Sequence, residues 1–290
     1  MGNKTPAHVR PQAAIAEICL TYLNSPQIRA LRHSTKEPWF RSSAKDTPFL
    51  EYCSVYWGVH AKNELSDYAK SLALELLQEY DDHVSGLWLM DKIGDLDSEC
   101  YSTIPRFNGL HCASFFGIDE VVAALIETQC YGTNRGYFWG ASPLTWAARN
   151  GHEEVVKILL GREEVDPDEP DDYGQTPLSY AAAKGNEEVV NILLQWEGVN
   201  CDKPDNRGRT PLSYAAQNGR LGVVKILLGQ EKISPDRLDN DGQTPLSYAA
   251  RGGQEEVMKM LLGQEEVNPD RPDNCGRTPL SYAAEGYFRG

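Results

Sequence analysis

The sequence predicts an all-α protein: a solenoid of helix-turn-helix repeats with short hairpin fingers, preceded by a small helical segment. The first observation is the phrase Thr-Pro-Leu-Ser-Tyr-Ala-Ala, which begins at Thr176 and returns every 34 residues up to the copy at Thr278. The second is a glycine that recurs at the same spacing from Gly117 to Gly253 and is followed each time by an apolar, helix-like run. A fixed period of this length, holding two short amphipathic segments, is typical of stacked repeats.

The N-terminal part predicts a small helical assembly rich in aromatic residues. Residues 13–32 place apolar groups at helical spacing, after Pro11 and with a break at residues 24–26, so we expect one helix and a shorter second one. Residues 33–47 are polar and contain Pro38, which indicates a loop.

Two further helices are expected in this part of the chain. Pro48 opens a segment whose aromatic and aliphatic residues, up to Trp57, line a helix face before Gly58. Asn63 is expected to cap the next helix, Glu64–Tyr80, in which apolar residues fall three or four positions apart.

Within each repeat, the recurring phrase predicts a short first helix. Thr176 offers a hydroxyl to the free N–H groups at the helix start, and Pro177 suits the first position because its missing N–H would be unpaired there. Alanines at 181–182 keep one face thin so that a neighbouring repeat can stack, while Tyr180 adds an apolar contact. Gly185 is expected to end the helix, since glycine adopts the left-handed conformation most easily.

The rest of the repeat predicts a second helix and a finger. Residues 187–194 place two glutamates in the first turn, where the helix dipole favours negative charge, and bury one side with valines and leucines. The polar stretch at 199–209 has the turn chemistry of a hairpin finger. No single repeat can bury its own apolar face, so stability is expected to come from the interfaces between neighbours.

This repeat resembles the ankyrin repeat, whose signature includes Thr-Pro-Leu-His-x-Ala. Looser copies of the phrase at 142–148 and 109–114 bring the array to about six repeats over residues 105–290. Serine, as in Ser179, takes the place of the family's histidine, and its hydroxyl still permits a local hydrogen bond. After Ala284 the last repeat has no second helix, which is expected either of a truncated array or of an end that something else covers.

The N-terminal segment, residues 1–104, carries a second resemblance. Ala-Glu-Ile-Cys-Leu-Thr-Tyr-Leu from Ala16, a polar loop, and Pro-Phe-Leu-Glu-Tyr-Cys-x-x-Tyr-Trp-Gly-x-His from Pro48 occur in this order. Over residues 8–61 this is similar to the segment that joins the nucleoside-triphosphatase module to the ankyrin array in fungal NACHT–ankyrin proteins of the NOD-like type. The resemblance implies an upstream NTPase module. The 290 residues of the sequence contain no Gly-x-x-x-x-Gly-Lys-[Ser/Thr] motif, so nucleotide binding by this chain is not expected.

Composition restricts the partners. The formal net charge is −14, and 28 of the 42 acidic side chains lie in residues 105–290, which fits either the solubility of an elongated array or an acidic docking face. A surface of this sign repels nucleic acid and anionic membranes, so neither is expected as a partner. The seven scattered cysteines are typical of reduced thiols in an intracellular protein, so we expect a cytoplasmic location, with a nuclear one left open. No window approaches 18 apolar residues.

The sequence offers no motif for catalysis or for a bound cofactor. The six histidines have no recognised metal-ligand spacing, and the repeated serines belong to the repeat scaffold. The acidic run at 163–172 is interrupted by proline and lacks the pattern of a calcium-binding loop. We therefore expect no catalytic, cofactor-binding or metal-binding residue, and no enzyme.

Function is expected to lie in binding another protein, on the concave side built by the fingers and first helices. Aromatic residues around Trp139 fit either an anchor for a partner or packing onto the N-terminal helices. The alternative is a sensing or regulatory C-terminal part of a NACHT nucleoside-triphosphatase, with the NTPase module as partner. The candidate partner-binding positions are those at which repeat copies differ, together with the aromatic finger: Trp139, Arg149, Asn150, Tyr173, Gln175, Lys184, Arg207, Arg209, Asn218, Asp241, Gln243 and Arg251.

Overall fold

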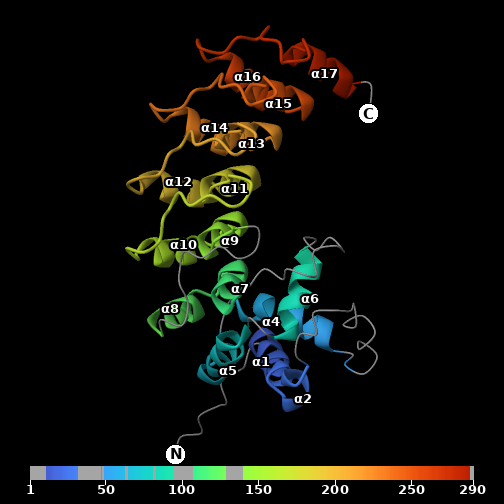
Figure 1. The fold of residues 1–290 in the computed structure, drawn as a ribbon, viewed down its shortest axis with the longest axis vertical. Coiled ribbons are helices and arrows are strands. Elements are labelled where there is room, and N and C mark those ends of the chain that lie inside the picture. The colour runs from blue at the N-terminus through green and yellow to red at the C-terminus, as the bar shows by residue number, and fades with distance from the viewer. Residues whose placement is uncertain are drawn as a thin grey trace, which may run out of the picture. The chain divides into compact units, whose positions relative to one another are not determined.

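In the computed structural model the described residues form helices joined by turns and loops, and no strand occurs among them, which confirms the all-α fold class. The chain divides into two compact units, residues 1–132 (unit 1) and residues 133–290 (unit 2). Helices carry the labels of Figure 1. The described residues are 11–31, 47, 49–62, 65–80, 83–93, 107–128 and 140–287.

Unit 1 is a bundle of short helices. α1 (Pro11–Leu23) packs against α4 (Leu50–Ala61) and α5 (Asp67–Gln78), and α4 also packs against α6 (Val84–Ile93). A turn after α1 leads into the short α2 (Pro26–Arg29), as the apolar spacing and the break predicted. α6 was not anticipated from the sequence, and the predicted loop at 33–47 lies outside the described residues except for its last one.

Gly58 lies inside α4, so the expectation that the helix stops before it is wrong. The reason for glycine is close packing: a Cβ at this position would overlap the ring of Phe116. The ring of Trp57 packs against the same phenylalanine with ring centroids 5.5 Å apart, and Trp57 is fully buried. Glycine therefore serves the aromatic core of unit 1 and does not end the helix.

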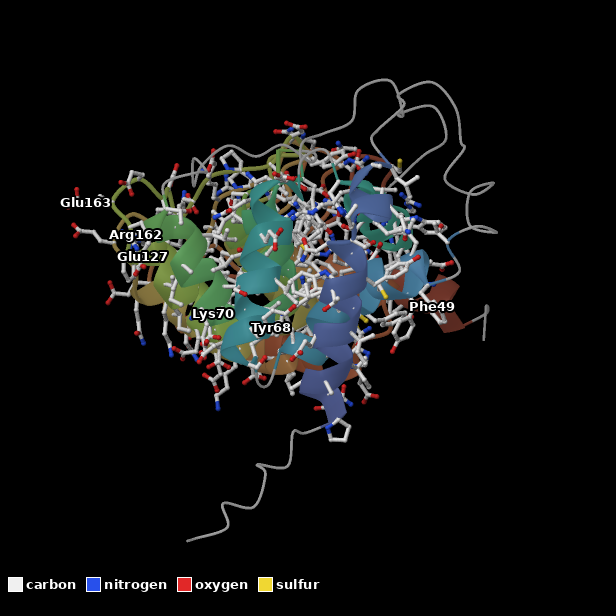
Figure 2. All side chains as sticks on the ribbon, turned by 90° about the horizontal axis from the view of Figure 1, so that it is seen from below. Phe49, Tyr68, Lys70, Glu127, Arg162 and Glu163 are labelled. Carbon is white, nitrogen blue, oxygen red and sulfur yellow. The ribbon has the colours of Figure 1, made fainter. Side chains whose placement is uncertain are left out.

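The start of α5 also differs from the prediction. Ser66, and not Asn63, caps the helix, because the N–H of Ala69 donates to the Ser66 Oγ over 3.0 Å. Tyr68 follows in the first turn of α5, and Figure 2 shows it together with Phe49, which precedes α4. Both aromatic side chains are exposed, by 56 % and 64 % respectively, so they add nothing to the core.

The first repeat belongs to unit 1. Its helices are α7 (Gly109–Phe116) and α8 (Asp119–Glu127), and both pack against α5. The Asn108 side chain accepts the N–H of His111 at the start of α7, and Gly117 ends that helix at a φ of 75°.

Unit 2 stacks the remaining repeats in two layers (Figure 1). The first helices pack on one another in one layer, and the second helices pack on one another in the other. α17 closes the series, and no second helix follows it within the described range. The pairs are α9 (Pro143–Asn150) with α10 (Glu153–Leu160), α11 (Pro177–Lys184) with α12 (Glu187–Gln195), α13 (Pro211–Gln217) with α14 (Leu221–Leu228) and α15 (Pro245–Arg251) with α16 (Glu255–Leu262), followed by α17 (Pro279–Tyr287).

The roles predicted for the recurring phrase are confirmed in α11. Thr176 Oγ1 accepts the N–H of Ser179 over 3.2 Å, and the serine hydroxyl lies 3.2 Å from the same oxygen. Gly185 ends the helix at a φ of 83°. The alanines at 181–182 are fully buried, so neighbouring first helices approach closely along them.

Candidate functional site

Each finger in the described part of unit 2 from residue 171 onward is a tight turn closed by an aspartate. In the finger at 205–209, the N–H of Asp205 donates to the carbonyl oxygen of Arg209 over 2.9 Å. The Asp205 Oδ1 accepts the N–H groups of Arg207 and Arg209, each at 2.8 Å. Gly208 supplies the left-handed residue, with a φ of 82°. The carboxylate therefore satisfies backbone donors that the turn would otherwise leave unpaired.

The second carboxylate oxygen ties the finger to the first helix. Asp205 Oδ2 accepts the hydroxyl of Tyr214, on α13, at 2.6 Å, and both side chains are buried. The sequence predicted only an apolar contact for the tyrosine of the phrase, and this bond was missed. The signal was present as an aspartate nine residues before each tyrosine. The same bond joins Asp171 to Tyr180 at 2.7 Å, Asp239 to Tyr248 at 2.6 Å and Asp273 to Tyr282 at 2.5 Å.

These tyrosines stay protonated. Burial, and then the hydrogen bond to the aspartate, raise the pKa of Tyr180, Tyr214 and Tyr248 well above the ordinary value. A tyrosinate would face the carboxylate in a largely buried position, so the hydroxyl remains a donor throughout the physiological range.

Neighbouring fingers are joined in a row. The backbone N–H of Asn206 donates to the carbonyl oxygen of Tyr173 over 2.9 Å, and its side-chain Nδ2 donates to the carbonyl oxygen of Asp172 over 2.9 Å. The same pair of bonds recurs at Asn240 and Asn274, each reaching the preceding finger. The row makes the fingers a continuous edge, and their tips hold fixed positions relative to one another.

A parallel row of ion pairs lies just before the fingers in the chain. Here a basic side chain of one repeat contacts a buried aspartate of the repeat before it, so each pair crosses a repeat interface. Burial raises the pKa of Asp202, and the Arg237 guanidinium opposes this rise. The pairs are Lys203–Asp168 at 3.2 Å, Arg237–Asp202 at 2.9 Å and Arg271–Asp236 at 3.0 Å.

Arginines and glutamines cover the tyrosine column. The Arg209 guanidinium lies 4.6 Å from the centre of the Tyr214 ring and also pairs with Asp205. The Arg251 guanidinium lies 4.4 Å from the centre of the Tyr282 ring. We term this surface the finger–helix face. From the fingers it includes residues 172–175, 206–209, 240–243 and 274–277. From the first helices it includes residues 146–150, 180–184, 214–217 and 248–251, together with Tyr282.

Some of the sequence-predicted candidates are engaged within the protein. Gln243 is buried, 5 % exposed, and its Nε2 donates to the Tyr282 hydroxyl over 3.0 Å, while Gln175 makes the equivalent bond to Tyr214. The side chains of Asn150 and Asn218 donate to carbonyl oxygens of their own helices, at 3.0 and 2.9 Å. These contacts make the residues part of the scaffold, whatever else they bind.

Other candidates are exposed on the finger–helix face. Tyr173, Arg207 and Asp241 occupy the same finger-tip position in successive repeats, and Lys184 and Arg251 lie at the ends of α11 and α15. Arg149 is half-buried, near the ring of Tyr180. Trp139 lies outside the described residues. Arg277, which lies 4.8 Å from the centre of the Tyr282 ring, is equivalent in the repeat to Arg209 and Gln243 but was not among the positions predicted from the sequence.

Charge is divided between two sides of unit 2. Among its described side chains, the finger–helix face has two acidic residues, Asp172 and Asp241, both exposed, and six basic ones, of which three are exposed and three are half-buried. The second helices and the loops after them bear the reverse balance, with twelve exposed glutamates; Arg162 and Glu163 mark this side in Figure 2. The six basic residues are Arg149, Lys184, Arg207, Arg209, Arg251 and Arg277.

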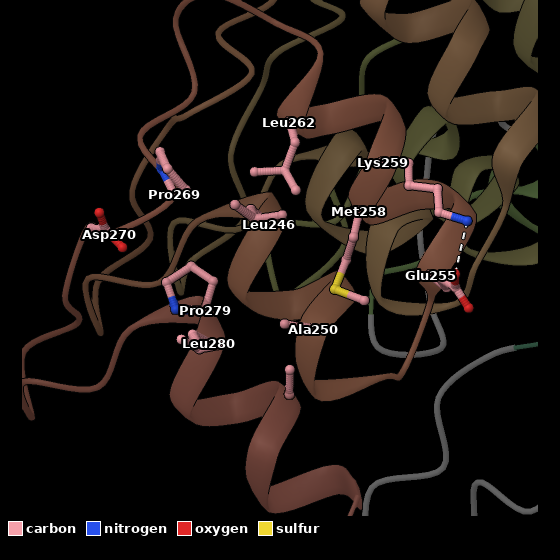
Figure 3. A pocket seen from close by; sticks show the side chains of 11 residues that line it. Leu246, Ala250, Glu255, Met258, Lys259, Leu262, Pro269, Asp270, Pro279 and Leu280 are labelled. Atoms are coloured by element: carbon pink, nitrogen blue, oxygen red, sulfur yellow. Dashed lines mark ion pairs between the residues drawn. The ribbon is translucent and has the colours of Figure 1, made fainter.

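An apolar groove of about 420 Å³ lies between α15, α16 and α17 (Figure 3). Leu262 and Leu280 line it and are 51 % and 73 % exposed. Leu246, one repeat before Leu280, is 3 % exposed because α17 packs on α15. The groove is therefore a repeat interface that no further helix fills within the described residues.

Two other kinds of site were sought in the same residues. No group of three or more histidine, cysteine, aspartate or glutamate side chains is placed to hold a metal ion in the described ranges. None of the described helices has the length and apolar character needed to cross a membrane.

A comparison with protein families bears on the repeats. The family model described as ankyrin repeats (3 copies) matches residues 88–171, 110–205, 159–239 and 231–289. Together these matches extend over more than half of the chain. No curated protein matches the sequence.

Proposed function

The chain belongs to the ankyrin-repeat family, and we propose that it is a non-enzymatic recognition protein that binds another protein on the finger–helix face, the concave side of the array. One observation carries this proposal. The fingers share a fixed backbone, held by the aspartate in each turn and by the asparagine row, but their exposed tips carry Tyr173, Arg207 and Asp241 in succession. A rigid scaffold that presents different side chains at equivalent places is suited to selective binding.

The contacts also guide the choice of residues for a test. An alanine at Arg209 would remove an ion pair with Asp205 and the stacking on Tyr214, so lost binding could reflect a changed finger. Lys184 and Arg207 are exposed and form no ion pair with a described residue, so they probe binding alone.

The test is capture from an extract of the source cells by three baits: the unchanged chain, Lys184→Ala/Arg207→Ala, and Lys157→Ala/Lys225→Ala. The last variant removes the same charge from the second helices. We expect at least one protein to be retained by the unchanged chain and by the Lys157→Ala/Lys225→Ala control but lost from the finger–helix variant. Equal capture by all three baits would contradict a binding role for this face.

A second candidate function rests on the order of phrases in residues 8–61. The two phrases form α1 and α4, which pack side by side, so the resemblance to the connector of NACHT–ankyrin proteins falls on an ordered element. In this proposal the repeats sense a ligand or restrain an NTPase module. The test is binding of the purified chain to a purified NACHT module in the presence and absence of ATP. No binding in either state would leave protein recognition by the repeats as the only proposed function.

A further inference from the structure

Three exposed basic groups on the finger–helix face have no carboxylate partner. Among described residues, the ion pairs of this face belong to Arg209 and Arg277, with Asp205 and Asp273. Lys184, Arg207 and Arg251 are exposed and form no ion pair within the same ranges. They belong to three successive repeats, Lys184 and Arg251 at the ends of first helices and Arg207 at a finger tip.

We propose that the partner is an extended protein segment that carries aspartate or glutamate residues opposite these three groups. The inference rests on the proposed function and adds the chemical class of the partner. Unlike potentials across an interface attract and set the register, and like charges are rejected. The chain has a net charge of −14, and its second helices and the loops after them expose twelve glutamates, whereas the finger–helix face exposes three basic and two acidic side chains. An acidic segment therefore meets these three basic groups on this face and repulsion on the other side.

Arg251 shows how a carboxylate is recognised there. Its guanidinium lies over the Tyr282 ring at 4.4 Å and near the Tyr248 ring at 5.7 Å. Stacking on a ring restricts a guanidinium while leaving the N–H donors at its edge for a carboxylate. Tyr248 and Tyr282 are themselves held by Asp239 and Asp273, so the platform for the arginine is fixed before a ligand arrives.

The stacking of repeats sets a spacing for the acidic residues. Packed helices lie about 8–10 Å apart, and an extended chain advances about 3.3 Å per residue. A segment that crosses the array therefore advances by one repeat in about three residues. Because Arg207 lies at a finger tip and Lys184 and Arg251 lie at helix ends, the distance between successive basic groups is longer than one repeat. The expected ligand has acidic side chains separated by about three residues or more.

Phosphate groups are also acidic, but nucleic acid is disfavoured. The twelve exposed glutamates on the second helices and their loops repel a long polyanion whose charge extends beyond the finger–helix face. A short acidic stretch within a protein of mixed charge avoids that repulsion.

The experiment is selection of short random peptides on the immobilised chain. Two variants are selected in parallel: Lys184→Glu/Arg207→Glu/Arg251→Glu, and the control Lys157→Glu/Lys225→Glu/Lys232→Glu, which makes the same change of charge on the second-helix side. Circular dichroism and urea unfolding are used to verify that both variants remain folded. The best peptide is then measured in solution, at low and physiological salt, beside a fluorescent single-stranded oligonucleotide.

We expect the unchanged chain and the second-helix variant to enrich peptides with acidic residues separated by about three residues or more. The finger–helix variant is expected to lose that enrichment and to bind the best peptide about tenfold or more weakly. Enriched peptides without acidic bias would overturn this inference but leave the proposed function standing. No peptide enriched by any bait would count against both. Saturable oligonucleotide binding that only the finger–helix variant loses would replace the acidic protein segment with nucleic acid.

Discussion

Unit 1 and unit 2 are both helical, but they differ in how often each stabilising contact occurs. Unit 1 depends on an aromatic core in which each contact occurs once, such as Trp57 on Phe116 and Tyr80 near Phe107. Unit 2 repeats the same aspartate–tyrosine bond in every described finger. A substitution in unit 1 therefore removes a contact that no other residue duplicates, whereas one in unit 2 removes one of several equivalent aspartate–tyrosine bonds.

Trp57→Ala is the most severe test of this comparison. Trp57 is fully buried against Phe116, so the variant leaves a large cavity, and we expect a loss of about 3–5 kcal/mol in the stability of unit 1. Hydrogen exchange of the amides in α1 and α4, followed with urea unfolding, measures this loss. Tyr68→Ala, at an exposed site on α5, is the control and is expected to change stability by less than about 0.5 kcal/mol. Equal effects of the two changes would contradict the assignment of Trp57 to the core.

Asp205→Ala is expected to have the next largest effect. The variant leaves the N–H groups of Arg207 and Arg209 and the hydroxyl of Tyr214 without their acceptor, and this costs about 2–3 kcal/mol. Urea unfolding followed through unit 2 measures the change. Asp241→Ala, at an exposed finger tip, provides a matched control that removes an aspartate without breaking a described side-chain bond. If the Asp205→Ala midpoint equals that of Asp241→Ala, the finger is not held by its carboxylate.

The same comparison explains how much could be predicted from the sequence. In unit 2 the repeat copies can be compared with one another, and the helix caps at Thr176 and Gly185 were predicted correctly. In unit 1 no copy exists. Gly58 was interpreted as a helix end because glycine has that role elsewhere in the chain, and only its distance from Phe116 reveals a packing role. The prediction of the α5 cap was also wrong, because Asn63 and Ser66 are both good capping residues and no second copy distinguishes them.

The candidate surface was predictable in outline but not in detail. Variation between copies indicated the exposed positions at Lys184, Arg207 and Arg251. It also selected Gln243, which the fold buries, because variation says nothing about burial. The bond between Asp205 and Tyr214 was missed because a spacing of nine residues from a turn to a helix matches neither helical nor strand periodicity.

Tyr214→Phe is a milder test of the same link. It removes one hydroxyl and keeps the ring under Arg209, so we expect a loss of about 1 kcal/mol. The double variant Asp205→Ala/Tyr214→Phe completes a thermodynamic cycle in urea unfolding. A coupling free energy near zero would show that the two side chains do not stabilise one another.

The smallest expected effect is a difference in the pH dependence of stability between the two ends of the finger row. Burial raises the pKa of Asp171, and the residue four positions later is the uncharged Gln175. In the finger of Asp273, burial is outweighed by the hydroxyl of Tyr282, the backbone N–H groups and the guanidinium of Arg277, and the pKa lies at about 2.

The two aspartates therefore give opposite signs. A lowered pKa in the folded state means that Asp273 stabilises the protein above its ordinary value near 3.8, and that this contribution is lost as the pH falls toward about 2. A raised pKa means that Asp171 favours folding more as the pH falls through its folded pKa toward 3.8. Urea midpoints of the unchanged chain, Asp171→Asn and Asp273→Asn between pH 6 and pH 3 test this, each compared with the unchanged chain at the same pH. On lowering the pH, the unchanged chain should gain stability relative to Asp171→Asn and lose it relative to Asp273→Asn. Shifts in the same direction for both variants would mean that the fingers of Asp171 and Asp273 are electrostatically equivalent.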